Sequence, residues 1–170
     1  MIELKRVVPE CNADTLLVEL ILRQGRAGHR HGITEVAKEL QRHDDAVTYR
    51  VGLVDTDKFR REHPLVLAFS EHVCDKLADF GILICKIPDT NIHLIRLHPE
   101  FESWIWNMAI KYEIQSAEFG IYTFTDLDKA CKRNLVREDV GLKAFINAIV
   151  QHDSEEIRLL RHWLRKVFEN

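Results

Sequence analysis

Two aspartates separated by one residue, Asp55 and Asp57, follow the apolar run VGLV (51–54), and the earlier run LKRVVP (4–9) is followed by Glu10. If the two runs form neighbouring parallel strands, their carboxyl ends lie at one edge of a sheet, where open α/β proteins bind ligands. Three carboxylates at one edge repel one another unless a cation lies between them. Hard oxygen ligands suit Mg²⁺ or Mn²⁺. We therefore predict a Mg²⁺ or Mn²⁺ site that contains Glu10, Asp55 and Asp57.

Two further acidic residues are candidate metal ligands. Asp14 lies about one helical turn after Glu10, and Glu100 follows a β-rich run that ends at residue 97. Acidic side chains near a helix N-terminus also complement the helix dipole, so Asp14, Glu100 and the neighbouring Glu102 have a structural explanation as well. Both explanations stay open, and Glu100 is our choice for an additional acidic ligand.

Basic residues flank these acidic positions in the sequence. If their two loops lie beside the carboxylates, they form a local basic rim that can hold phosphate groups. The commoner alternative is a pair of solvated charged loops, and the HxH pattern is only a weak metal signal. The candidate nucleic-acid-binding residues are Arg26, His29, Arg30 and His31 in the first loop, and Lys58, Arg60 and Arg61 in the second.

The overall composition limits the class of protein. The chain has 170 residues, of which 46% are hydrophobic, so it can bury a substantial core. Its formal net charge of −3 argues against a strongly basic nucleic-acid-binding protein, so such a partner would have to meet a local patch. It contains no apolar run of membrane-spanning length and no signal-peptide-like start, and its four cysteines lack the spacing of a zinc site. We expect a cytoplasmic protein with reduced thiols and no membrane partner.

The pattern of apolar residues predicts alternating strands and helices. A hairpin is expected where PDTN (88–91) separates two β-rich runs, and Pro99 is expected in the first turn of the following helix. The last helix is expected to begin with a capping box from Asp153 to Glu156. The expected strands are 4–9, 47–54, 82–87 and 92–97. The expected helices are about 13–24, 33–43, 65–80, 126–133, 138–150 and 154–168, together with the helix that has Pro99 in its first turn and carries Phe101, Trp104, Ile105 and Met108 on one face.

This order predicts an α/β fold with a mostly parallel central sheet flanked by helices, Rossmann-like in class, with a helical C-terminal part. We expect residues 1–97 to form the α/β core and residues 98–170 to form a helical extension packed on the same domain.

The segments VVPECNADTLLVELIL (7–22) and VGLVDTDK (51–58) resemble the two signatures of the TOPRIM family. This family includes type IA and type II topoisomerases, bacterial primases, a ribosomal-RNA-maturation ribonuclease and OLD-type nucleases. In these proteins a glutamate follows the first strand and a DxD follows a later strand. The residues that match in order and type are Glu10, Asp14, Asp55 and Asp57, which lie in roughly the first third of the chain.

Two departures from the family pattern stand out, so the fold is predicted as a TOPRIM-like variant. Cys11 occupies a position that is usually glycine, which suits a tight turn. The stretch RQGRAGHRHG (23–32) lacks the apolar strand that a full TOPRIM sheet has there.

The resemblance implies Mg²⁺- or Mn²⁺-dependent cleavage of phosphodiester bonds in DNA or RNA. By carry-over, Glu10 acts as general base or acid, and Asp55 and Asp57 hold the metal. Because the sequence shows neither a P-loop nor a DNA-binding module, a protein partner would supply nucleic-acid recognition or ATPase activity.

Two alternatives differ in class. The chain could be a non-catalytic TOPRIM-like adaptor that binds a protein partner, in which case Cys11 would mark a degenerate site. It could also be a phosphatase of the haloacid dehalogenase type, because an apolar run before DxD occurs there too. That group expects the DxD near the first strand, whereas here a strand and Glu10 come earlier.

Overall fold

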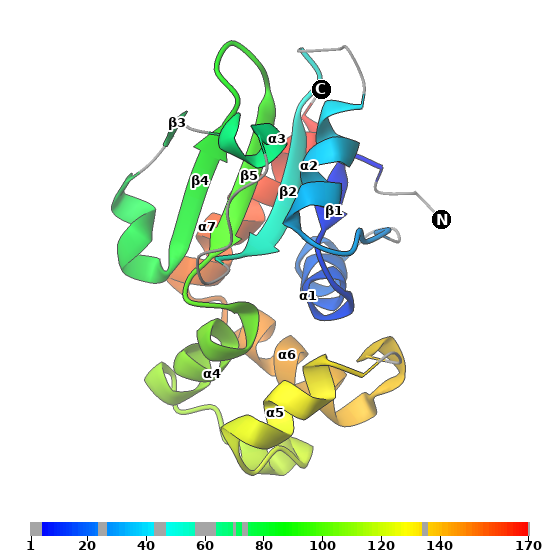
Figure 1. Cartoon of the computed structure of the whole chain (residues 1–170). Helices are drawn as coiled ribbons and strands as arrows, with labels where there is room; N and C mark the ends of the chain where they lie inside the picture. The colour runs from blue at the N-terminus through cyan, green and yellow to red at the C-terminus, as the bar shows by residue number, and fades with distance from the viewer. Residues whose placement is uncertain are drawn as a thin grey trace.

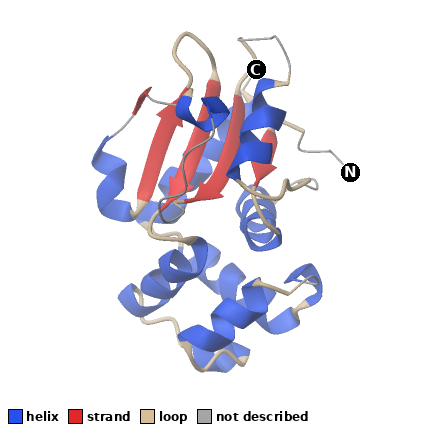
Figure 2. Ribbon diagram, in the orientation of Figure 1, coloured by secondary structure: helices blue, strands red, loops and turns tan. Residues whose placement is uncertain are grey.

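The computed structural model of the protein describes residues 5–23, 27–42, 47–56, 64–69, 71–72, 75–133 and 136–169. Figure 2 shows a central sheet with helices around it. The strands are β1 (Val7–Pro9), β2 (Arg50–Asp55), β3 (Glu71–His72), β4 (Ile82–Lys86) and β5 (Ile92–Leu97). The α-helices are α1 (Asn12–Leu22), α2 (Ile33–Gln41), α3 (Pro64–Leu67), α4 (Phe101–Lys111), α5 (Phe124–Cys131), α6 (Val140–His152) and α7 (Glu155–Arg165). Short 3₁₀ helices are η1 (Asp75–Phe80), η2 (Ser116–Phe119), η3 (Val136–Glu138) and η4 (Lys166–Phe168).

The sheet has the strand order β1-β2-β5-β4-β3. β1 pairs in parallel with β2, with Val7 opposite Val51, and β2 pairs in parallel with β5, with Asp55 opposite Leu97. β4 runs antiparallel to β5 and to β3, so the predicted hairpin of β4 and β5 is confirmed. Because every strand except β4 runs in one direction, the predicted α/β class with a mostly parallel sheet and a helical C-terminal part is confirmed.

The two faces of the sheet are covered by different helices. In Figure 1, α2 and α3 lie in front of the sheet and α7 lies behind it. Side chains alternate along β2, so Val51 and Leu53 join the core cluster with α1 and α7, whereas Val54 joins the cluster with α2 and α3. α2 packs so closely on β2 that a Cβ atom at Gly52 would lie 2.7 Å from Val36 Cγ1. The absence of a side chain at Gly52 therefore permits this contact.

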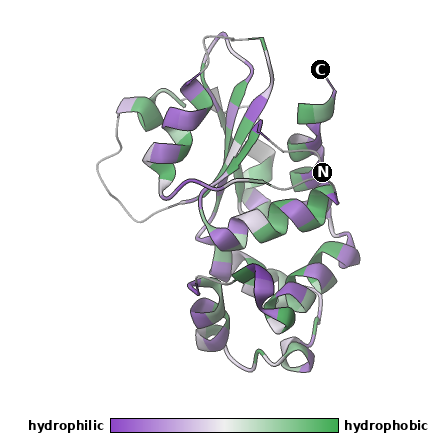
Figure 3. Ribbon diagram, turned by 90° about the vertical axis from the view of Figure 1, so that its right-hand side faces the viewer, coloured by the Kyte–Doolittle hydropathy of each residue, from purple (hydrophilic) through white to green (hydrophobic). Residues whose placement is uncertain are grey.

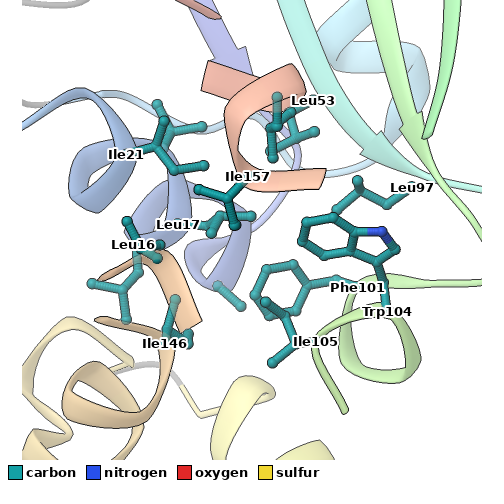
Figure 4. Packing of buried hydrophobic residues seen from close by; sticks show 14 of the residues in the cluster. Leu16, Leu17, Ile21, Leu53, Leu97, Phe101, Trp104, Ile105, Ile146 and Ile157 are labelled. Atoms are coloured by element: carbon teal, nitrogen blue, oxygen red, sulfur yellow. The ribbon is translucent and has the colours of Figure 1, made fainter. Parts of the chain in front are cut away.

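The helical C-terminal part faces the carboxyl end of the parallel strands. In Figure 1, α4, α5 and α6 lie beyond the end toward which the β2 arrow points. Figure 4 shows Trp104 of α4 beside Leu97 of β5, and Leu16 and Leu17 of α1 near Ile146 and Ile157 of α6 and α7. The larger buried cluster thus includes residues from both sides of residue 97.

The helices carry both polar and apolar residues along their length, as Figure 3 shows in colour. Among the residues that the structure describes, no helix has both the length and the apolar character needed to cross a membrane.

The predicted helix over 65–80 is wrong. Among the described residues of this stretch, only α3 (64–67) is α-helical, and it is followed by β3 and by η1. Val66 and Phe69 pack in the cluster on the α2 face, whereas Leu77 packs in the cluster on the opposite face. The chain crosses from one face of the sheet to the other around β3, which one continuous helix with a single apolar side cannot do.

Two predicted helix starts also differ in the structure. Asp153 is the left-handed C-cap of α6, with φ 54°, and the N-cap of α7 is Ser154, whose side chain accepts a hydrogen bond from Ile157 N. The predicted capping box from Asp153 to Glu156 is therefore wrong, because an N-cap has extended backbone. Pro99 precedes Glu100, the N-cap of α4, and so lies before the first helical turn.

Candidate functional site

Glu10 and Asp55 meet at the carboxyl end of the neighbouring strands β1 and β2. The backbone N–H of Glu10 donates to Leu53 O over 2.9 Å, which continues the parallel pairing by one residue. The Glu10 side chain then accepts a hydrogen bond from the backbone N–H of Asp55, with Oε2 3.0 Å from the nitrogen. Two of the carboxylates that the sequence singles out are thus held together by strand pairing.

Asp55 also holds the start of α4. Its Oδ1 accepts a hydrogen bond of 2.8 Å from Phe101 N, although Glu100 is the N-cap residue by position. The Glu100 side chain makes no capping bond to the helix backbone, and its Oε1 accepts instead from Ser103 Oγ over 2.6 Å. Asp55 therefore has a structural role at the helix N-terminus in addition to its position at the candidate site.

Asp14 is fully buried next to these two carboxylates. It lies in the first turn of α1 with 0% of its surface exposed, and its Oδ2 accepts from Cys11 N over 3.2 Å. Its Oδ1 is buried without a hydrogen-bond partner among the described residues. Burial raises the pKa of Asp14 well above the usual value, and the negative charges of Asp55 and Glu10 raise it further. Asp14 is a buried carboxylate close to two others.

Cys11 closes the turn that leads from β1 into α1. It is the N-cap of α1 with φ −135° and ψ 178°, an extended conformation that any residue adopts. Its Sγ accepts from Asp14 N over 3.4 Å, and the Asp14 side chain accepts from Cys11 N, which completes a capping box. Burial raises the pKa of the Cys11 thiol, and the negative charge of Asp14 raises it further. The turn therefore requires no glycine at this position.

The loop that contains His29, Arg30 and His31 lies beside the end of β1. Arg30 N donates to Pro9 O over 3.0 Å, and Pro9 directly precedes Glu10. The rings of His29 and His31 are in edge contact, with centroids 4.7 Å apart. Partial burial lowers the pKa of His29, and the positive charges nearby lower it further. The Arg30 guanidinium pairs with Glu39 of α2, with Nη2 3.2 Å from Oε2.

Arg137 of η3 anchors this loop, although no sequence pattern links it to the loop. Its Nη2 donates to Glu19 Oε1 over 2.8 Å and to Ala27 O over 2.7 Å. In the stretch 23–32, where the sequence lacks an apolar strand, the described residues 27–32 form no strand.

The remaining predicted site residues are in the parts of the chain outside the description. These are Asp57 of the DxD pair and the basic residues Arg26, Lys58, Arg60 and Arg61.

Glu102 and Asp128 are two further carboxylates near the site, and neither was among the metal ligands selected from the sequence. Burial raises the pKa of the Cys131 thiol in α5, and the charges of nearby carboxylates raise it further. Burial likewise raises the pKa of Glu102, with added contributions from Asp128 and Glu100. The carboxylates that act on Cys131 are Glu102, Asp14, Asp128 and Asp55. No sequence signal links Glu102 to Asp128, because α4 and α5 bring them together only in the tertiary structure.

The described residues supply the right type of donor atom for a metal ion, but too few of them are grouped together to form a site. Carboxylate oxygens are the donors that Mg²⁺ and Mn²⁺ prefer, and the unbonded Oδ1 of Asp14 is a buried oxygen that lacks a donor. Within the described ranges, no three His, Cys, Asp or Glu side chains are grouped so that they could hold a metal ion. A complete site would need Asp57, which is outside those ranges.

Comparison of the chain with protein-family models, with curated proteins and with solved structures gives no match.

Proposed function

We propose that this protein is a metal-dependent nuclease of TOPRIM-like type, which cleaves phosphodiester bonds in DNA or RNA with Mg²⁺ or Mn²⁺. The observation that carries the proposal is the meeting of Glu10 and Asp55 at the carboxyl end of two parallel strands, beside the buried Asp14. This edge of an α/β sheet is the usual place for a ligand. Carboxylates that repel one another at such an edge cost stability, which a bound cation would restore.

Each residue has a specific task in this proposal. Asp55 and Asp57 hold the ion, and Glu10 accepts or donates a proton at the reacting oxygen. The bound ion would neutralise phosphate charge and orient the attacking water or hydroxyl. The hydrogen bond from Asp55 N to Glu10 Oε2 fixes the Glu10 carboxylate relative to β2.

The basic loops are proposed to contact the nucleic acid around this site. His29, Arg30 and His31 support this role, since Arg30 N bonds to the residue before Glu10. Arg26, Lys58, Arg60 and Arg61 are assigned the same role by their positions in the sequence. A protein partner that supplies recognition or ATPase activity completes the proposal.

The first test is calorimetric titration of Mn²⁺ and Mg²⁺ into the wild type and into Asp55→Asn/Asp57→Asn, followed by cleavage assays on labelled DNA and RNA. Asparagine is preferred to alanine at residue 55, because its amide oxygen can still accept the bond from Phe101 N. A suitable control is Asp89→Asn, an exposed left-handed turn residue with φ 59° in the β4–β5 hairpin.

We expect saturable metal binding and cleavage in the wild type and the control, and loss of both in the double variant. Metal binding without cleavage would point to a missing partner or another phosphoester substrate. If the wild type binds neither ion at millimolar concentration, the nuclease proposal fails and the adaptor alternative is favoured.

A further inference from the structure

A second site candidate lies at the other end of α1, away from the carboxylates. A groove of about 300 Å³ runs between the C-terminal ends of α1 and α6 and the side of α7. Its polar wall consists of Arg23, Arg161, Arg165 and Asp153, and Ile21 and Val150 give it an apolar floor. The 11 residues of α1 span about 16 Å, and this length separates the groove from the Glu10 region at the other end of the helix.

The groove is positively charged in a chain that is acidic overall. Three arginines and one aspartate leave two net positive charges on the wall. Arg161 and Arg165 belong to a basic face of α7 that also includes Arg158, because residues at three- and four-residue spacing share one side of a helix. The formal net charge of the whole chain is −3, so this concentration of arginine is local.

The arginines are held in different ways. Arg161 is paired with Asp153, and Arg23 Nη2 donates to Gln151 Oε1 over 2.9 Å. The Arg165 side chain is exposed and makes no hydrogen bond or ion pair with the described residues. Two guanidinium groups are thus positioned by neighbours, and a third remains available to a ligand.

Helix capping does not account for this arrangement. α1 and α6 both end at the groove, and arginine near a helix C-terminus often bonds the last carbonyls. Here the terminal carbonyls of Glu19 and Val150 accept from the backbone N–H groups of Arg23 and Asp153. The guanidinium groups of Arg23 and Arg161 donate instead to the side chains of Gln151 and Asp153.

We propose that the groove lined by Arg23, Arg161 and Arg165 binds phosphate groups of a nucleic-acid backbone. Guanidinium groups form paired hydrogen bonds to phosphate oxygens, and such contacts position a nucleic acid without reading its sequence. The choice of nucleic acid as the source of the phosphate rests on the proposed nuclease function. The residues that line the groove are different from the basic residues that were assigned above to nucleic-acid binding.

The test is fluorescence anisotropy with a labelled duplex DNA and a labelled single-stranded RNA, at several NaCl concentrations, with chelator present. The groove variant is Arg23→Gln/Arg165→Gln, which keeps Arg161 paired with Asp153. The control is Lys38→Gln/Lys143→Gln, which removes the same charge from exposed positions on α2 and α6. We expect the groove variant to bind more weakly than the control, with a salt-dependence slope that is smaller by about 1 for each lost phosphate contact.

Equal affinity and equal slope for the groove variant and the control would overturn the proposal. A calorimetric titration with inorganic phosphate separates the two sources of phosphate. The proposal would also be overturned if inorganic phosphate binds tightly and yet does not displace the oligonucleotide from the wild type or from the variant. The groove would then serve a small anion.

The groove proposal and the nuclease proposal can each fail without the other. Binding is measured without metal, so the groove proposal stands if the groove variant loses affinity although the wild type never cleaves. Conversely, a wild type that cleaves and a groove variant with unchanged binding would sustain the nuclease proposal alone.

Discussion

Glu156 in α7 and Asp14 in α1 are both buried carboxylates, with 3% and 0% of their surfaces exposed, but their neighbours differ in charge. Glu156 accepts from Lys111 Nζ over 2.6 Å and from Tyr112 OH over 2.7 Å, so each of its oxygens has a donor. Burial by itself would raise the pKa of Glu156, and these hydrogen bonds outweigh burial and lower it. Asp14 has an oxygen with no donor within the part of the chain that the structure describes, and its pKa is raised by burial and by Asp55 and Glu10.

The difference separates a structural carboxylate from a candidate functional one. The contact of Glu156 with Lys111 and Tyr112 ties α7 to the end of α4 and satisfies every group involved. The Asp14 region leaves a buried oxygen unsatisfied and brings like charges together, which costs stability in the metal-free protein. Unsatisfied buried oxygens and neighbouring like charges are expected where a site serves a ligand.

The largest expected effect is on activity, from Glu10→Gln. Glutamine can still accept the bond from Asp55 N, so the fold should be retained, but it cannot accept a proton from the reacting group. We expect cleavage to fall by a factor of about 10² to 10⁴. The measurement is the single-turnover cleavage rate with Mn²⁺, together with the melting temperature.

The control for Glu10→Gln is Glu118→Gln, an exposed change of the same chemistry in η2. If both variants cleave at the wild-type rate, Glu10 is a structural carboxylate like Glu156, and the comparison between the two regions collapses.

The next effect is on stability, from Glu156→Ala. Removal of the carboxylate leaves Tyr112 OH without its acceptor and deprives Lys111 of its counter-charge. We expect the free energy of unfolding, measured by urea titration, to fall by about 2 kcal/mol at pH 7.

Glu155→Ala changes an exposed neighbour in the same helix turn and should alter stability by no more than about 0.5 kcal/mol. Because the pKa of Glu156 is lowered in the folded protein, its contribution is present above the ordinary value of 4.5 and is lost as the pH falls through the folded pKa. A deficit that is the same at pH 7 and at acidic pH would contradict this assignment.

The smallest effect is expected from Asp14→Asn in metal-free protein with chelator, and it has the opposite sign. Because the pKa of Asp14 is raised in the folded state, the folded protein holds more protons than the unfolded chain, and stability is lost as the pH rises through the folded pKa. The variant removes this loss, so its melting temperature should exceed that of the wild type by about 2 to 4 °C at pH 8 and by less at pH 5.

Asp89→Asn is the matched change at an exposed turn and should leave the melting temperature unchanged at both pH values. A lower melting temperature for Asp14→Asn at pH 8 would mean that the Asp14 carboxylate stabilises the fold, as Glu156 does.

Prediction from the sequence succeeded where local pattern and fold agree. The β-rich apolar runs predict the strands that became β2, β4 and β5, and PDTN predicts the hairpin between the last two. It failed over 65–80, where apolar residues at helical spacing serve opposite faces of the sheet. The spacing of apolar residues indicates which residues are buried, but it does not indicate on which face of the sheet they pack.

For the candidate site, the sequence alone determined that acidic residues follow two predicted strands, because residue order fixes what lies at a strand end, whereas the pairing of those two strands as neighbours is seen in the structure. Only the tertiary structure decided that Asp55 bonds to α4, that Glu102 and Asp128 approach the same region, and that the arginines of α1 and α7 line one groove. These contacts join residues far apart in the chain, so they depend on how helices pack against the sheet and leave no local pattern. In the sequence, Asp14 looks like any acidic residue at a helix start. Asp14 and Glu156 are both buried, and what separates them is their neighbours, which are the carboxylates Asp55 and Glu10 for Asp14 and the donors Lys111 and Tyr112 for Glu156.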